Sequence, residues 1–68
     1  MPLEPYQQRV VDEKTELDER LRKLRAFAAS DTFLALLPSD ARLLGQQAMH
    51  MMDYSEVLRQ RINNFKGA

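Results

Sequence analysis

The sequence contains no cysteine, a single histidine and only two glycines. The absence of cysteine excludes disulfide bonds, thiolate zinc sites and cysteine-based catalysis. With His50 as the one imidazole, a zinc ion would need carboxylate or water ligands elsewhere, so we expect no metal site. Two glycines can hardly form a phosphate-binding loop, and no nucleophile–base pair or carboxylate cleft is evident. We therefore expect neither an enzyme nor a bound cofactor.

Neither sign of charge is in excess. Ten Lys and Arg residues balance ten Asp and Glu residues, giving a formal net charge of zero at pH 7. This balance argues against DNA as a partner, because DNA-binding domains carry a basic excess. No apolar run approaches the roughly 20 residues that cross a bilayer, and the N-terminal residues lack the apolar core of a signal peptide. We expect a cytoplasmic protein with no membrane partner.

The chain is also short, with 68 residues that we expect to form one domain over 1–68. Ordering a residue costs about 1.5 kcal/mol, and two helices bury only one stripe each, which leaves little net stability. Since disulfides and metal ions are excluded as additional stabilisation, association remains. We therefore expect a homo-oligomer.

A first long helix is predicted over about residues 4–29. Pro5 suits the first helical turn, where its missing N–H is not needed, and Glu4 places negative charge at the positive end of the dipole. Apolar residues then recur at the spacing of one helical stripe. This stripe consists of Val10, Leu17, Leu21, Leu24 and Ala28.

A short helix over about residues 31–37 and a second long helix over about 39–65 follow. Ser30 or Asp31 is suited to cap the short helix, Pro38 to end it, and Ser39 to cap the second long helix. The stripe of the second long helix consists of Leu44, Ala48, Met51, Leu58, Ile62 and Phe65. Because the connection is short, the long helices should be antiparallel neighbours. The predicted fold is therefore all-α, an antiparallel hairpin that oligomerises through its helix faces.

The second long helix carries more apolar surface than one partner helix needs. Leu43, Met52, Tyr54 and Val57 flank its stripe, and the connection contains large apolar side chains that would be costly to leave in water. We therefore predict a second interface. Its candidate residues are Phe33, Leu37, Leu43, Met52 and Val57.

Lys14 occupies a stripe position between Val10 and Leu17, where the pattern favours an apolar residue. One interpretation is structural: Lys14 snorkels, pairs with a carboxylate such as Asp18, or sets the register of the oligomer. The other is that it lines a polar cavity and binds an anion. The sequence leaves both open.

Tyr6 and Tyr54 stand near basic residues, and aromatic stacking combined with phosphate pairing is what a nucleotide ligand requires. Both tyrosines also fit the edge of a helical core, and this alternative stays open. The candidate ligand-binding residues are Tyr6, Arg9, Lys14, Tyr54 and Arg61.

Two stretches of the chain carry a resemblance to known proteins. The first comprises residues 6–19 with Leu21, Lys23, Leu24 and Phe27, and the second comprises Leu43, Leu44, Gln47, Met49, Met52, Tyr54, Leu58, Arg61 and Ile62. Together they resemble a widespread group of small phage and prophage proteins related to a crAss-like phage protein. The resemblance covers nearly the whole chain. It implies a phage gene product that acts in the cytoplasm of the infected bacterium.

Small helical phage proteins often serve in counter-defence. The predicted architecture resembles the anti-CBASS and anti-Thoeris sponges, which are oligomeric helical hairpins that hold cyclic nucleotide signals between subunits. Those sponges use a tyrosine near the N-terminus, for which Tyr6 is a counterpart, and a lysine, which Lys14 and Lys23 do not match in position. The resemblance to the sponges is architectural.

Two functions follow as hypotheses. The first is a sponge that sequesters a cyclic nucleotide second messenger in pockets between subunits. The alternative is a non-catalytic inhibitor or adaptor that binds a host defence protein or a phage protein through an exposed helix face. The over-wide second stripe and the apolar connection support the alternative, whereas the combination of tyrosine, lysine and arginine near the open end of the hairpin supports the sponge.

Overall fold

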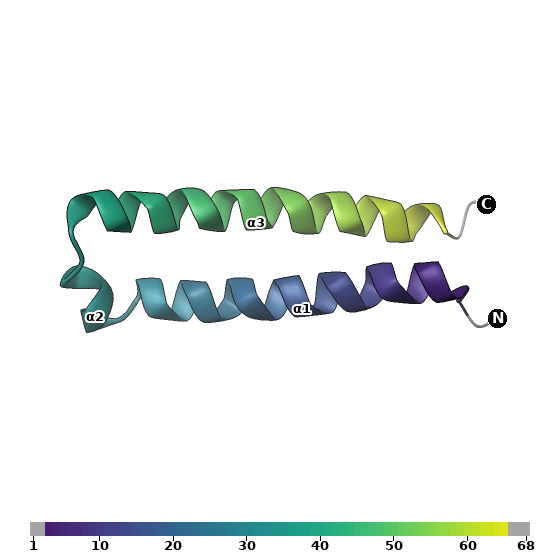
Figure 1. Ribbon diagram of the computed structural model, residues 1–68, viewed down its shortest axis with the longest axis horizontal. Coiled ribbons are helices and arrows are strands. Elements are labelled where there is room, and N and C mark those ends of the chain that lie inside the picture. The colour runs from purple at the N-terminus through teal and green to yellow at the C-terminus, as the bar shows by residue number, and fades with distance from the viewer. Residues whose placement is uncertain (1–2, 66–68) are drawn as a thin grey trace.

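The computed structural model describes residues 3–65, which form helices α1 (Pro5–Ala28), α2 (Asp31–Leu34) and α3 (Pro38–Asn64). Helices α1 and α3 lie side by side and antiparallel, with α2 at the closed end of the hairpin (Figure 1). The molecule is a rod with extents of 49 × 15 × 14 Å. The predicted all-α hairpin with a short connecting helix is confirmed.

The start of α1 follows from its first residues. Glu4 is the N-cap, and its backbone N–H donates a hydrogen bond to the side-chain oxygen of Gln7 at 2.9 Å. Pro5 occupies the first turn, where its fixed φ is already helical. The helix ends at Ala28, one residue before the predicted end.

The connection differs from the prediction in two details. Ser30 caps α2 as one of the two candidates, accepting a hydrogen bond from the Phe33 N–H at 3.3 Å, but α2 ends at Leu34 rather than near residue 37. The prediction that Ser39 caps the second long helix was wrong. Leu37 is the N-cap and Pro38 starts α3, because proline fits the first helical position and there needs no N–H donor.

The core lies between α1 and α3 and is small. Val10, Leu17 and Leu21 from α1 are buried, together with Leu58 from α3, whose side chain is 0% exposed. Met51, Ile62 and Phe65 are half-buried against this cluster, so both predicted stripes face each other. Large apolar side chains remain exposed along the rod. They are Leu3, Tyr6, Leu34, Leu37, Leu43, Met49, Met52, Tyr54 and Val57.

Gly45 lies inside α3 without a packing reason for being glycine. A Cβ atom built there meets no heavy atom within 4 Å. Because glycine costs about 1 kcal/mol relative to alanine in a helix interior, Gly45→Ala is expected to raise the free energy of unfolding by about that amount. Urea unfolding followed by circular dichroism measures the change. A loss of stability instead would mean that another chain approaches the α3 backbone at Gly45.

Candidate functional site

Lys14 is engaged in a structural contact between the two long helices. Its Nζ donates to Asp18 Oδ2 at 2.6 Å, and Ser55 Oγ from α3 donates to Asp18 Oδ1 at 2.5 Å. The Asp18 carboxylate thus joins a cation on α1 to a hydroxyl on α3. We call the flank of the hairpin that carries these three residues the Lys14 side. The pairing with Asp18 agrees with the structural interpretation of Lys14.

This contact predicts a pH dependence of stability. Hydrogen bonds from Lys14, then from Ser55, hold the pKa of Asp18 below its ordinary value of 3.8. A carboxyl group with a lowered folded-state pKa stabilises the protein above its unfolded pKa and loses this contribution as the pH falls through the folded-state pKa. At pH 7, Asp18→Asn is therefore expected to be less stable than the wild-type protein. The difference should shrink below pH 3.8.

Urea unfolding of both proteins at pH 7 and at several values below pH 3.8 measures this convergence. Comparing the two proteins isolates Asp18 from the exposed Glu56, whose pKa is lowered to about 2, first by its hydrogen bond with Arg59 and then by one with Gln60. A stability difference that stays constant over the whole range would show that the Asp18 charge contributes nothing.

The other predicted ligand-binding residues lie on the opposite flank. Successive residues of a helix are about 100° apart, so Tyr54 and Ser55 lie on opposite sides of the α3 core stripe. Arg61 follows Tyr54 by nearly two turns and shares its side. On α1, Arg9 precedes the buried Val10 and points away from the Lys14 side. We call this second flank, with Arg9, Tyr54 and Arg61, the Tyr54 side.

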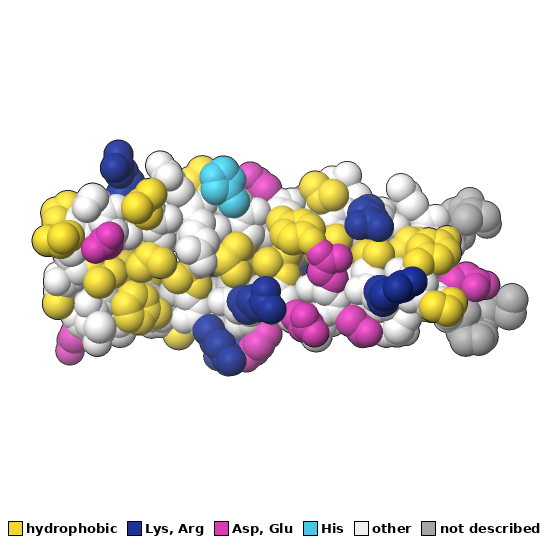
Figure 2. All heavy atoms as spheres, in the orientation of Figure 1, with side chains coloured by type: hydrophobic (Ala, Val, Ile, Leu, Met, Phe, Trp, Pro, Cys, Tyr) yellow, Lys and Arg dark blue, Asp and Glu magenta, His cyan; other side chains and the backbone are white. Residues whose placement is uncertain are grey.

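The register of the hairpin brings Arg9 and Arg61 to the same end. The Tyr6 and Phe65 rings meet edge to face with centroids 6.3 Å apart, so the first turn of α1 lies beside the last turn of α3. Arg9 is consequently level with the α3 turn that carries Arg61. Figure 2 shows both basic and acidic side chains beside hydrophobic ones at this end. Within residues 3–65 the ion pairs use Lys14, Arg22 and Arg59, so Arg9 and Arg61 form none.

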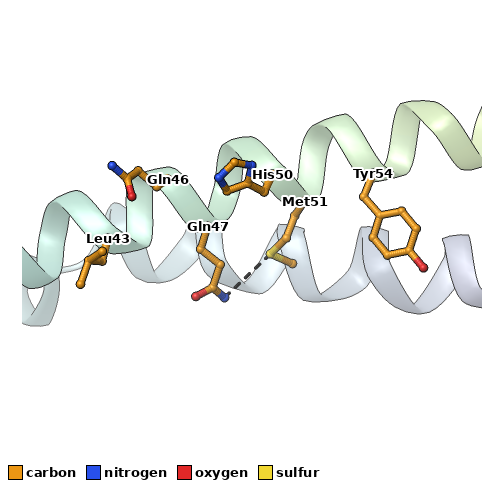
Figure 3. A pocket seen from close by; sticks show the side chains of 6 residues that line it. All are labelled: Leu43, Gln46, Gln47, His50, Met51 and Tyr54. Atoms are coloured by element: carbon orange, nitrogen blue, oxygen red, sulfur yellow. Dashed lines mark hydrogen bonds between the residues drawn. The ribbon is translucent and has the colours of Figure 1, made fainter.

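A shallow groove of about 490 Å³ continues the Tyr54 side along α3. Figure 3 shows that its lining comes from α3 alone, with the Gln47 amide directed at the Met51 sulfur at 3.9 Å. Leu43 and Tyr54 belong to separate predicted sets. Between them, Met51 was predicted as a core residue, and neither glutamine nor His50 was predicted as a site residue. The sequence signal for this groove was the recurrence of its lining residues at intervals of three and four along α3. The lining residues are Leu43, Gln46, Gln47, His50, Met51 and Tyr54.

The five predicted interface residues do not form one surface. Phe33 is half-buried and meets Phe27 edge to face at 6.2 Å, so it closes the end of the hairpin. Leu37 is 67% exposed at the same end. Leu43 and Val57 lie along the Tyr54 side, whereas Met52 falls on the Lys14 flank of α3 by its helical position.

A second hollow, near the closed end, is lined by apolar residues including Leu24, Leu44 and Ala48, but holds only about 80 Å³. Ligand pockets usually measure roughly 300 Å³ or more.

Among residues 3–65, no three His, Asp or Glu side chains are placed to hold a metal ion. None of the helices in this part of the chain is long and apolar enough to cross a membrane. The candidate site is the open end of the Tyr54 side, where Tyr6, Arg9 and Arg61 lie and where Glu13, four residues after Arg9, shares the flank.

The chain is similar to known sequences at the level of a family model. A family model described as Sequestin matches residues 4–64, which include all three helices. No curated protein and no solved structure shows significant similarity to the chain.

Proposed function

The chain belongs to the Sequestin family, and from that premise we propose that it is a non-catalytic protein that sequesters a cyclic nucleotide immune signal between the subunits of a homo-oligomer. The family name is consistent with sequestration. The phage setting, and with it a counter-defence role in the host cytoplasm, rests on the resemblance of residues 6–19 and 43–62 to small phage proteins.

One observation carries the choice of ligand class. Arg9 and Arg61 share the open end of the Tyr54 side and form no ion pair within the described residues, while Tyr6 at this end is 57% exposed. Two guanidinium groups can pair with phosphate oxygens, and an exposed aromatic ring can stack on a base. Both recognition elements of a nucleotide are thus available at one place.

An oligomer would bury the ligand, whereas a single hairpin leaves the site open. Ligand sites bury most of the ligand surface, whereas the groove on the Tyr54 side is lined by one helix and is shallow. A protein that sequesters a signal must bind it tightly, and tight binding of a small ligand needs a site that buries most of its surface. A second chain over the open end would close it.

Calorimetry of the intact oligomer against a panel of cyclic dinucleotides and trinucleotides tests this function. We expect one member of the panel to bind, and to be released chemically unchanged. Tyr6→Ala should weaken binding about fivefold to 150-fold, since stacking contributes about 1–3 kcal/mol per base. The matched control is Leu34→Ala, which removes a side chain that is 79% exposed near the closed end. Absence of binding across the panel would contradict the proposal.

The alternative function, a protein-binding inhibitor or adaptor, is favoured by the closed end. Leu34 and Leu37 are 79% and 67% exposed there, three residues apart in the sequence. Because Phe33 is already packed on Phe27, Leu37→Asp tests this surface with less damage to the hairpin than Phe33→Asp would cause. Capture of a host or phage protein by the wild type and its loss in Leu37→Asp would support the alternative.

A further inference from the structure

The Tyr54 side of α3 carries a regular pattern that the hairpin itself does not use. Its residues recur at alternating intervals of four and three, the spacing of the a and d positions in left-handed helix bundles. Leu43, Tyr54 and Val57 within this pattern are 55%, 45% and 53% exposed. We call the set the outer stripe. It consists of Leu43, Gln47, His50, Tyr54, Val57 and Arg61.

The chain exposes more surface than a compact protein of its mass, as expected of a two-helix rod, and this surface is available for a partner. The accessible surface is 5479 Å², whereas a compact monomer of 7.9 kDa exposes about 4,400 Å². The radius of gyration of 15.5 Å likewise exceeds the roughly 11 Å of a compact domain of this length. The excess area, about 1,000 Å², is comparable to the roughly 800 Å² that each partner buries in a standard interface.

From these observations we infer that a second copy of this chain packs on the outer stripe, with the two α3 helices antiparallel. Reversing the stripe about its midpoint places Gln47 opposite Val57 of the second copy and His50 opposite Tyr54. The same residues thus serve both chains, as a two-fold interface requires, and the pairing closes without leaving a free stripe. The product is a four-helix bundle made of two hairpins.

Charge favours the antiparallel orientation. A parallel pairing would bring the two Arg61 side chains together. The antiparallel pairing instead separates the two Arg61 side chains and places each opposite Leu43 of the second copy. This arrangement also opposes the two helix dipoles.

The interface would complete the ligand site, a consequence that rests on the proposed function. Antiparallel packing brings the open end of one hairpin, with Tyr6, Arg9 and Arg61, beside the end of the second copy's α3 that carries Leu43. Each dimer would then hold two equivalent sites, each with residues from both chains. A monomer would have only the open half.

Disulfide trapping in this cysteine-free chain tests the interface directly. In the double variant Gln47→Cys/Val57→Cys, the two cysteines of one helix are about 15 Å apart, too far to bridge within the chain. Antiparallel pairing places the cysteine at position 47 of one chain beside the cysteine at position 57 of the second copy. Oxidation should therefore give a covalent dimer in buffer but not in urea. The matched control, Met49→Cys/Arg59→Cys, has the same spacing off the stripe and should stay monomeric on denaturing gels.

The single variant Val57→Cys separates the two orientations. Antiparallel pairing leaves the two introduced cysteines far apart, whereas parallel pairing would join them. A covalent dimer of this single variant, an equal yield from the off-stripe control, or a monomeric mass of the wild type in sedimentation equilibrium would each overturn the inference. Trapped dimers that bind no nucleotide would leave the interface standing and remove the proposed function. Nucleotide binding by a protein that gives no trapped dimer would support the proposed function and overturn the inferred interface.

Discussion

Leu58→Ala is expected to lower the free energy of unfolding by about 3 kcal/mol. Leu58 is the one fully buried large side chain within residues 3–65, and it packs with Val10 and Leu17 at the centre of the seam. Large-to-alanine changes in cores cost about 2–5 kcal/mol, because the transfer free energy is lost and a cavity remains. A two-helix core of this size has few neighbouring side chains to refill the space.

Urea unfolding at one fixed protein concentration measures the effect, since association makes stability depend on concentration. Met49→Ala is the matched control: it lies on the same helix, removes a side chain of similar size, and is 63% exposed. We expect the control to change stability by less than about 0.5 kcal/mol. If both variants lost the same stability, the core would not be centred on Leu58. If Leu58→Ala is unfolded in buffer, Leu58→Met provides a milder change at the same position.

Most of the fold was predictable from the sequence because helical periodicity is a local signal. The spacing of Val10, Leu17 and Leu21 defines the buried face of α1 without knowledge of the partner helix, and all three are buried. The start of α3 was harder to predict, since both Pro38 and Ser39 are suited to a helix start. The helix begins at the proline, and Leu37 takes the cap position without a side-chain hydrogen bond.

The composition of the candidate site was harder to predict because it depends on which flanks of the two helices meet. Helical spacing alone places Lys14 and Arg9 on opposite flanks of α1, but it does not say which flank of α3 each of them meets. The hydrogen bond between Ser55 and Asp18 fixes this arrangement. Lys14 therefore lies away from Tyr54 and Arg61, together with which it was predicted to bind a ligand.

At the closed end, too, the packing of the hairpin decides which of the predicted residues stay exposed. Phe33 was predicted as an interface residue because four large apolar side chains in a connection need cover. The cover for Phe33 comes from Phe27 of the same chain, which leaves Leu34 and Leu37 as the exposed pair. A sequence alone does not show which of several apolar side chains the hairpin uses for itself.

The largest functional effect is expected for Arg9→Ala/Arg61→Ala, which should weaken nucleotide binding at least a hundredfold. A hydrogen bond to a charged group contributes about 1.5–3 kcal/mol, so the loss of two phosphate contacts amounts to about 3 kcal/mol or more. Neither arginine has an ion-pair partner within the described residues whose loss would destabilise the hairpin. Far-ultraviolet circular dichroism should therefore show an unchanged helix content, and calorimetry measures the affinity.

The control for net charge is Arg22→Ala/Arg25→Ala, which removes two positive charges from α1 away from the open end. Its affinity for the nucleotide should stay within about threefold of the wild type at about 0.15 M salt, where charges farther apart than about 8 Å are largely screened. An equal loss in both double variants would mean that the ligand responds to overall charge and not to a site at the open end.

Lys14→Met then distinguishes the two interpretations of the charged seam position. Because Lys14 Nζ is already bound to Asp18 at 2.6 Å, on the flank opposite Arg61, its removal should reduce stability and leave nucleotide affinity unchanged. Calorimetry and urea unfolding of the same variant separate the two effects. A large loss of affinity with intact stability would return Lys14 to the ligand site, and it would require the bound nucleotide to reach across the seam to the Lys14 side.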